Sequence, residues 1–175
     1  MKNLYTIIAI LFALATSAQD GSLDTTFGID GILDIPNLCK IRSAKIQSDG
    51  KIVGSGYINE SGGIFRACIF RLNTDGSLDT SFDTDGKLIF NYYGTYDSVI
   101  SLYVYEDGKI LAGLEYGKLL RLNQDGSYDA TFGVNGIVDS TGYFIAVQAD
   151  GKIVSTAVYT AGFFKIFRHN PNGSL

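Results

Sequence analysis

The stretch RLNTDGSLDTSFDTDGKLIF, residues 71–90, decides the fold, because the motif at its centre recurs along the chain. DGSLDTSFDTDG at 75–86 is preceded by DGSLDTTFGIDG at 20–31 and followed by DGSYDATFGVNG at 125–136. A fourth copy, NGSL, begins at residue 172. The chain therefore repeats a unit of about 50 residues, and a period of that length is typical of stacked repeat arrays.

A second motif alternates strictly with the first. It reads IQSDGKIV at 46–53, VYEDGKIL at 104–111 and VQADGKIV at 147–154. Each Asp-Gly pair lies between two apolar runs, which predicts a tight hairpin with a type I′ turn and positive φ at both central residues. Alternating apolar residues before the turn, such as Ala44 and Ile46, predict a strand. Small residues after the turn are expected to let a neighbouring sheet approach closely; they are Gly54, Ala112 and Ser155.

The third element of each unit is also a predicted strand. It reads IFRLN at 69–73, LLRLN at 119–123 and IFRHN at 166–170. Phe70 and Leu72 lie on one face of it and Arg71 on the other, and a further β-prone run, 87–93, follows the first motif. Four short strands in about 50 residues are typical of a β-propeller blade, whereas the rungs of a β-solenoid, the alternative, are usually shorter. The predicted fold is all-β, a β-propeller-like array of four-stranded antiparallel blades in about three repeats.

Residues 1–18 differ from the rest of the chain. Lys2 gives a positive start, an almost wholly apolar run extends from Leu4 to Ala15, and small residues follow at 16–18. A membrane anchor would need roughly 20 apolar residues, so this shorter run favours a secretory signal peptide. We therefore predict a signal peptide at 1–18 and a repeat domain at 19–175. The protein is expected to be secreted or held at the cell surface, and not to span the membrane after cleavage.

The number of repeats bears on whether the predicted propeller is complete. Closed propellers usually have four to eight blades, whereas this sequence holds three periods, starting near 20, 75 and 125, and a fourth that begins at 172. We expect the array to be incomplete and to continue with further repeats in a longer parent chain.

Charge and cysteine content narrow the possible partners. The formal net charge is -4 and charged residues make up 18% of the chain, without the clustered Lys and Arg of a nucleic-acid surface. We therefore expect no nucleic-acid partner.

Export would permit disulfides. However, Cys39 and Cys68 fall near opposite edges of one predicted sheet, and a bridge needs Cα atoms within roughly 7 Å. We expect two free, partly buried thiols.

The polar and aromatic residues shared by the copies are expected to serve the fold. The loop 73–79 offers oxygen atoms at alternate positions that suit Ca²⁺, but the same residues suit a turn closed by Asp and Asn side chains, which we favour. Each repeat arginine is expected to pair with a repeat carboxylate such as Asp79 or Asp129, rather than to join an anion-binding ring. These arginines are Arg71, Arg121 and Arg168. The phenylalanines Phe27, Phe82 and Phe132 are expected to be core plugs.

The chain offers little for catalysis. Its single histidine, His169, occupies the position held by Leu72 and Leu122 in the other copies, so we expect a strand residue and not a ligand or base. One His without a Cys cluster does not favour a zinc site or a histidine-activated nucleophile. We assign no residue to catalysis, to a cofactor or to a metal, and Ca²⁺ at 73–79 is the one cofactor left open.

Function is expected where the copies differ. The first unit carries an insertion at 59–63 where the second has only 115–117, and insertions at one place in each repeat map to loops on one face, often the binding face. The loop near 91–97 is a second variable segment. A local aromatic cluster is expected from Tyr92, Tyr93, Tyr96, Tyr103 and Tyr105, although the absence of Trp weakens a sugar-stacking platform.

Two functions are compatible with this pattern. The leading hypothesis is an exported, non-catalytic structural or binding module, with an adhesion role at the cell surface as one form and an unknown protein or glycan as partner. The alternative is a polysaccharide-active hydrolase or lyase with a site in the blade loops. Glu60 and Glu115 are the non-repeated carboxylates whose replacement would test that alternative.

The run DGSLDxTFGxxG, followed by QxDGKI and RLNxDGSLD, resembles the delta-60 repeat family. The resemblance covers nearly all of residues 19–175, with small departures: Asp83 replaces the usual Gly, and Tyr105-Glu106 replaces the usual Gln. It implies a secreted or surface-attached bacterial protein of β-propeller-like repeats and unknown function. It implies no catalytic residues; many members end in a sorting domain, which we do not expect within residues 19–175.

Overall fold

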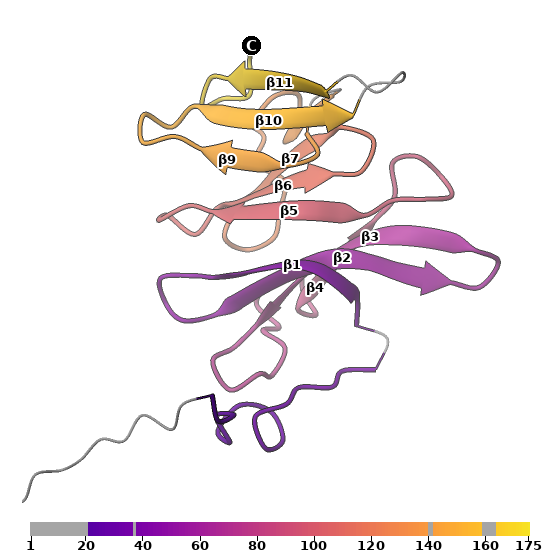
Figure 1. Ribbon diagram of the computed structural model, residues 1–175, viewed down its shortest axis with the longest axis vertical. Helices are drawn as coiled ribbons and strands as arrows, with labels where there is room; N and C mark the ends of the chain where they lie inside the picture. The colour runs from indigo at the N-terminus through magenta and orange to yellow at the C-terminus, as the bar shows by residue number, and fades with distance from the viewer. Residues whose placement is uncertain (1–20, 37, 140–141, 159–163) are drawn as a thin grey trace, which may run out of the picture.

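A computed structural model describes residues 21–36, 38–139, 142–158 and 164–175, which form eleven strands and no helix (Figure 1). The strands build three antiparallel sheets, so the predicted all-β class is confirmed. The predicted signal peptide, 1–18, lies outside the described residues. Within the described part of the chain, no helix is long and apolar enough to cross a membrane.

The three sheets follow one another along the chain and each is a meander. The first contains β1 (Lys40–Ile46), β2 (Ile52–Glu60), β3 (Ile64–Leu72) and β4 (Lys87–Phe90), in that order. The second contains β5 (Val99–Val104), β6 (Ile110–Leu114), β7 (Leu119–Leu122) and β8 (Ile137–Val138). The third contains β9 (Ile145–Val147), β10 (Ile153–Val158) and β11 (Phe164–His169). The predicted four strands are thus present in the first two units.

The Asp-Gly hairpins are present, but their predicted turn type is wrong. In the first, only Gly50 has positive φ, at 82°, while Asp49 does not. The Gly50 N–H donates to the Gln47 carbonyl at 3.0 Å, and the Gln47 N–H donates to the Lys51 carbonyl at 2.8 Å. This is a type I turn that ends in a glycine bulge, one residue longer than a type I′ loop. The other two hairpins repeat it, with positive φ at Gly108 and Gly151.

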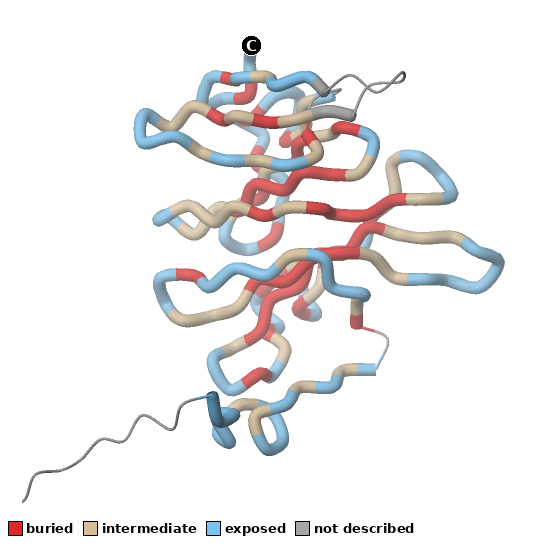
Figure 2. The backbone as a smooth tube through the Cα atoms, in the orientation of Figure 1, coloured by how far each residue is buried: buried red, intermediate tan, exposed pale blue. Residues whose placement is uncertain are grey.

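The sheets bury apolar side chains against one another. Val99 and Leu102 of β5 lie in a core shared with Val53 and Ile69 of the first sheet. Tyr103, on the opposite face of β5, packs in a second core with Leu111, Phe132 and Ile153. Because β5 is apolar on both faces, it can be covered from both sides, and Figure 2 shows buried backbone concentrated in the middle strands.

The predicted core plugs lie where consecutive repeats meet. Phe82 and Phe132 are fully buried, as predicted. Phe27, the third predicted plug, is only half-buried, so the prediction is wrong for that residue. A Cβ added to Gly126 would lie 3.1 Å from the Phe82 ring, and one added to Gly173 would lie 2.9 Å from Phe132. Each ring therefore sits against the glycine of the next Asp-Gly or Asn-Gly pair. Gly54 is small for a different reason than predicted, because the Phe70 ring of the adjacent strand β3 fills the space beside it.

The two ends of the strands form different surfaces. The Asp-Gly hairpins lie together on one side of the molecule, on the left in Figure 1. The turn between β2 and β3 lies on the opposite side, and hydrogen bonds tie its base to the loop after β4. The Phe65 N–H donates to the Thr95 carbonyl at 3.0 Å. The turn between β6 and β7 is tied to the same loop, because the Glu115 N–H donates to the Ser98 carbonyl at 2.9 Å. We call this second side the variable-loop face; it contains 59–63, 91–98 and 115–118.

Candidate functional site

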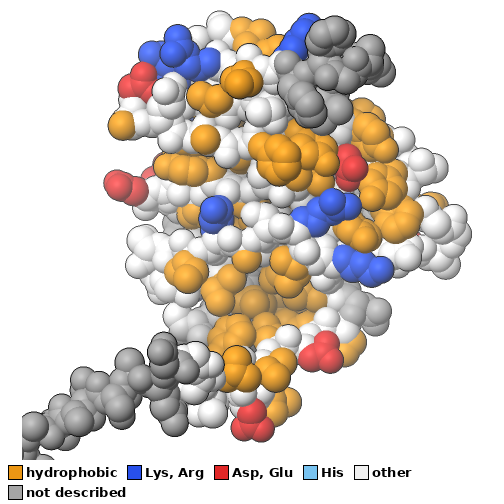
Figure 3. Space-filling view, viewed as in Figure 1, with side chains coloured by type: hydrophobic (Ala, Val, Ile, Leu, Met, Phe, Trp, Pro, Cys, Tyr) orange, Lys and Arg blue, Asp and Glu red, His pale blue; other side chains and the backbone are white. Residues whose placement is uncertain are grey.

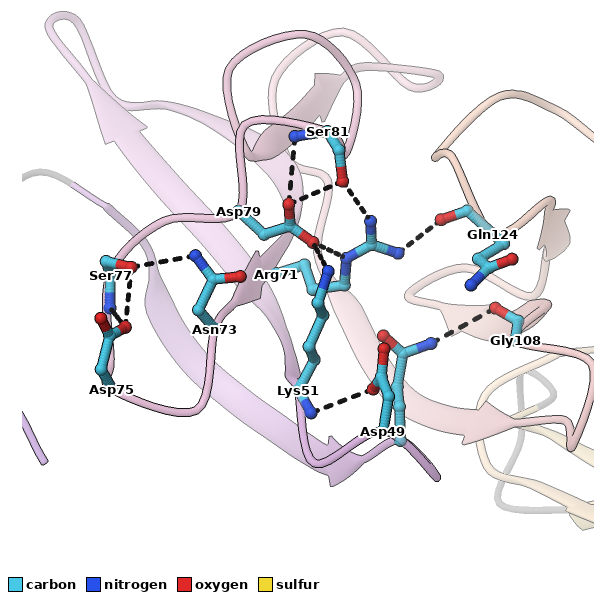
Figure 4. Close-up of polar contacts among 11 residues, drawn as sticks. Asp49, Lys51, Arg71, Asn73, Asp75, Ser77, Asp79, Ser81, Gly108 and Gln124 are labelled. Carbon is cyan, nitrogen blue, oxygen red and sulfur yellow. Dashed lines mark hydrogen bonds and ion pairs between the residues drawn. The ribbon is translucent and has the colours of Figure 1, made fainter.

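The shared polar residues form a buried ion cluster between the first and second sheets (Figure 4). Asp79 Oδ2 accepts from Arg71 Nε at 2.6 Å and from Lys51 Nζ at 2.8 Å. Asp79 Oδ1 accepts from the Ser81 hydroxyl at 2.6 Å. Arg71 also donates to the Gln124 carbonyl of the next repeat. The predicted Arg71–Asp79 pair is confirmed, and it joins two repeats.

The second repeat copies this arrangement. Asp129 accepts from Arg121 and from Lys109, each at 2.8 Å. Arg121 then donates to the Pro171 carbonyl at 2.6 Å, one repeat further along. Both guanidinium groups lie over a plug ring, 5.0 Å from Phe82 and 4.5 Å from Phe132. The predicted Arg121–Asp129 pair is also confirmed, so the cluster serves the repeat and not one site. Arg168, at the corresponding position of β11, is exposed.

These contacts decide the charge state of the shared aspartates. Burial opposes the ionisation of Asp79. Hydrogen bonds from Lys51, Ser81 and Arg71 outweigh it, and they hold the Asp79 pKa far below its ordinary value. The Asp129 pKa is lowered for the same reasons, through Lys109, Thr131 and Arg121. Carboxylates held as permanent anions by two cations are poorly suited to proton transfer.

The loop 73–79 has the hydrogen bonds of the turn interpretation. The Ser77 N–H donates to Asp75 Oδ1 at 2.9 Å, and the Asn73 side chain donates to the Ser77 hydroxyl at 2.9 Å. Gly76 takes the positive φ that the turn requires. Oxygens of Asp75, Ser77 and Asp79 that could bind Ca²⁺ thus accept protein hydrogen bonds. Over the described residues, no group of three or more His, Cys, Asp or Glu side chains is placed to hold a metal.

His169 is a buried strand residue, as its repeat position predicts. It pairs with Ile153 across the sheet, and its ring lies 3.2 Å from the Ser155 hydroxyl and 3.3 Å from the Gly173 carbonyl. Burial lowers the His169 pKa, and the contact with Gly173 opposes this only in part. The ring is therefore a buried structural group whose two nitrogens face Ser155 and Gly173.

Aromatic side chains meet on the variable-loop face. Tyr57 and Phe65, from opposite strands of the β2–β3 hairpin, have ring centroids 5.4 Å apart. Tyr96 lies 4.8 Å from Phe65 and 6.4 Å from Tyr116, which contacts Tyr93 at 5.3 Å. We call these five rings the aromatic platform. It crosses from the first sheet to the β6–β7 turn of the second.

Three cations border the aromatic platform. The Arg42 guanidinium lies 5.3 Å from the Tyr57 ring centroid and donates to the Tyr96 hydroxyl. Lys40 lies 5.8 Å from the same ring, and Lys118 lies 5.3 Å from Tyr93. Across the described ranges, neither Lys40 nor Arg42 makes an ion pair. Figure 3 shows hydrophobic side chains beside Lys and Arg on this side of the molecule. Lys118 is paired with Asp139, so among the described residues Lys40 and Arg42 supply the unpaired positive charge beside the platform.

The loops hold the aromatic platform in a fixed geometry. Asp97 is fully buried, and its carboxylate accepts from the backbone N–H groups of Tyr92 and Tyr93 at 2.7 and 2.9 Å. Tyr116 is 60% exposed and has φ of 64°. A bulky residue in this left-handed region is unusual and costs roughly 1–3 kcal/mol. Such strain often accompanies functional sites.

Sequence analysis predicted only some of the residues that form this surface. Of the five tyrosines predicted to cluster, Tyr93 and Tyr96 belong to the aromatic platform. Tyr92 instead packs against Phe90 and donates to the Tyr128 hydroxyl. Tyr103 and Tyr105 do not join the platform, because both lie on the opposite side of the second sheet and pack against the third. Tyr57, Phe65 and Tyr116 were missed, since only strand pairing brings them to Tyr96. The sequence did offer one indication of them, because Tyr57 and Phe65 lie on the two strands of the longest hairpin.

The non-repeated carboxylates lie near the aromatic platform but do not act as a pair there. Glu60 makes an exposed ion pair with Arg66 at 2.7 Å. Glu115 precedes Tyr116, and its Oε2 is buried without a hydrogen-bond partner among the described residues. A glycosidase needs one carboxylic acid and one carboxylate at the same bond. Among the described residues, no contact brings Glu60 and Glu115 together in that role.

The cysteines are free thiols, but their predicted separation is wrong. Cys39 precedes β1 and turns toward β3, so its sulfur lies 4.0 Å from the Cys68 carbonyl. Strand order alone placed them three spacings apart. The segment before β1 instead covers the outer face of the first sheet, where Leu38 packs with Cys68.

Comparison with known proteins bears on the repeats. Residues 47–82 and 106–132 match the family described as a domain of unknown function (DUF5122) beta-propeller. The first segment contains the hairpin turn, β2, β3 and the motif through Phe82, and the second contains the corresponding part of the next repeat through Phe132. The match supports a β-propeller repeat family. No curated protein matches the chain.

Proposed function

We propose that this chain is an exported, non-catalytic binding module of the delta-60 type, built from stacked β-propeller blades. The blade assignment is supported by the ion clusters and plug rings, which repeat from unit to unit in one register. Export is supported by the signal-peptide pattern of residues 1–18.

The ligand that we propose is an acidic polysaccharide bound along the aromatic platform. The observation that carries this proposal is the continuous row of rings from Tyr57 to Tyr93, bordered by Lys40, Arg42 and Lys118. Tyrosine rings supply flat apolar area with a polar tip, and they are common at binding surfaces. Basic side chains on the rim would attract a chain of uronic-acid or sulfated sugars.

The state of the carboxylates among the described residues favours binding over cleavage. The shared aspartates are held as anions by two cations each, and Glu60 is in an exposed ion pair. The runner-up function, a polysaccharide hydrolase or lyase, would need Glu115 or Glu60 as a working carboxyl group.

A glycan panel tests the proposal. Mature protein is titrated with acidic polysaccharides (polygalacturonate, alginate, heparin) and with neutral ones (xylan, β-glucan), and reducing ends and unsaturated products are measured in the same samples. We expect binding to an acidic member that weakens with added salt, and no products. Product formation abolished by Glu115→Gln or Glu60→Gln would establish the enzyme instead. Binding to neutral polymers alone, or to none, would overturn the proposed ligand.

A further inference from the structure

The two cysteines lie against each other's backbone. The Cys39 sulfur is 4.0 Å from the Cys68 carbonyl oxygen, and the Cys68 sulfur is 3.6 Å from the carbonyl oxygen of Leu38, the residue before Cys39. Because of these reciprocal contacts, the two thiols lie side by side, between the segment that precedes β1 and the middle of β3. The residues are 29 apart in sequence, so a bond here would close a long loop.

The two thiols differ in access. Cys68 is fully buried in a small core with Leu38 and Phe70. Cys39 is only partly buried and lines a pocket of about 210 Å³ with Ile35 and Tyr57. Hydrogen bonding with the Cys39 thiol, and then burial, raises the pKa of the Cys68 thiol. Because Cys39 is the more accessible thiol, an oxidant can reach it first.

We propose that Cys39 and Cys68 are a modification site, a pair of thiols that a small disulfide oxidant converts into a disulfide. The Cys39 thiolate attacks the oxidant disulfide, which forms a mixed disulfide and releases one thiol. The Cys68 sulfur then loses its proton and attacks the Cys39 sulfur, which forms the Cys39–Cys68 bond and releases the second thiol. Two cysteine thiols are oxidised and one oxidant disulfide is reduced to two thiols, which carry the two protons.

The bond would fasten the first sheet to the segment that covers it. Leu33, Ile35 and Leu38 pack over the outer face of that sheet, and hydrophobic side chains line a hollow there in Figure 3. In the thiol form this segment is held by side-chain packing. The disulfide would restrict its detachment, chiefly by removing conformations from the unfolded chain. Export, as proposed above, supplies oxidising surroundings, but the test does not depend on it.

The test uses purified mature protein treated with oxidised glutathione. We expect wild type to lose both free thiols and two hydrogen masses, to yield one peptide linking Cys39 to Cys68, and to melt several degrees higher than the reduced form. The variant Cys68→Ser should stop at one glutathione on Cys39, because the resolving thiol is gone. The variant Cys39→Ser should keep Cys68 unmodified.

Three results would overturn the proposal. Wild type could retain both thiols, accumulate glutathione on Cys39 without forming the link, or join two chains through Cys39. The wild-type mass and peptide map decide among these outcomes even if a serine variant fails to fold. Addition of a reductant should return the melting temperature to its starting value.

Discussion

Replacing Asp79 by Asn keeps the size of the side chain but removes the negative charge that Arg71 and Lys51 share. The Asp79 and Arg71 side chains are 7% and 4% exposed, so Arg71 would remain buried without a counter-ion. Removing one member of a buried pair costs about 3–5 kcal/mol. Lys51 is 30% exposed and can regain water, which reduces the loss. We expect Asp79→Asn to lower the free energy of unfolding by about 2–3 kcal/mol.

Urea unfolding followed by circular dichroism measures this loss. Asp129→Asn is the matched variant in the next repeat, and it should cost somewhat less, because Arg121 is 11% exposed. Asp75→Asn is the control, since its carboxylate lies in the same turn but is exposed. If Asp79→Asn cost no more than Asp75→Asn, the cluster would not hold the repeats together.

The same variant predicts a pH dependence. The folded-state pKa of Asp79 is depressed, so wild type gains stability from its ionised form above the unfolded pKa of 3.8. That gain falls as the pH drops below about 5, toward the folded-state pKa. The stability difference between wild type and Asp79→Asn should therefore be constant near neutrality and shrink in acid. A difference that grew in acid would contradict the ion pairing.

Three further variants test other parts of the structure. Phe82→Ala should cost about 3–5 kcal/mol in urea unfolding, because the fully buried ring leaves a cavity between repeats; a cost below about 1 kcal/mol would show that the ring is no plug. Tyr116→Gly should not lower the melting temperature, because glycine relieves the positive φ at an exposed position; a clear decrease would show that its ring contacts outweigh the strain. Burial lowers the His169 pKa, so wild type should lose stability as the pH falls below about 6.5, where unfolded histidine is protonated. His169→Leu should remove that loss between pH 7.5 and 5.5, and an unchanged pH profile would contradict the assignment.

The repeats allowed most of the fold to be predicted. Strict alternation of two turn motifs placed the hairpins, and the comparison of copies correctly assigned Arg71, Phe82 and His169 to the fold. Short-range geometry was less predictable. The Asp-Gly pairs read as type I′ turns, yet the preceding residue extends each loop, and only the glycine takes positive φ.

The candidate site was largely beyond sequence reasoning. A one-residue register irregularity, a chain reversal before β1 and the approach of two turns decide which side chains meet. Proximity in sequence grouped Tyr103 with Tyr96, although they lie on opposite sides of a sheet, and it could not connect Tyr57 with Tyr116. The covering segment likewise brought Cys39 to Cys68 against the strand order.

Binding of an acidic polysaccharide by Tyr116→Gly and by Phe144→Ala tests the central claim most directly. The two side chains are 60% and 58% exposed, but only Tyr116 belongs to the aromatic platform. We predict that Tyr116→Gly weakens binding roughly five- to tenfold at an unchanged melting temperature, while Phe144→Ala binds as wild type does. Equal affinities for both variants would contradict the platform as the binding surface.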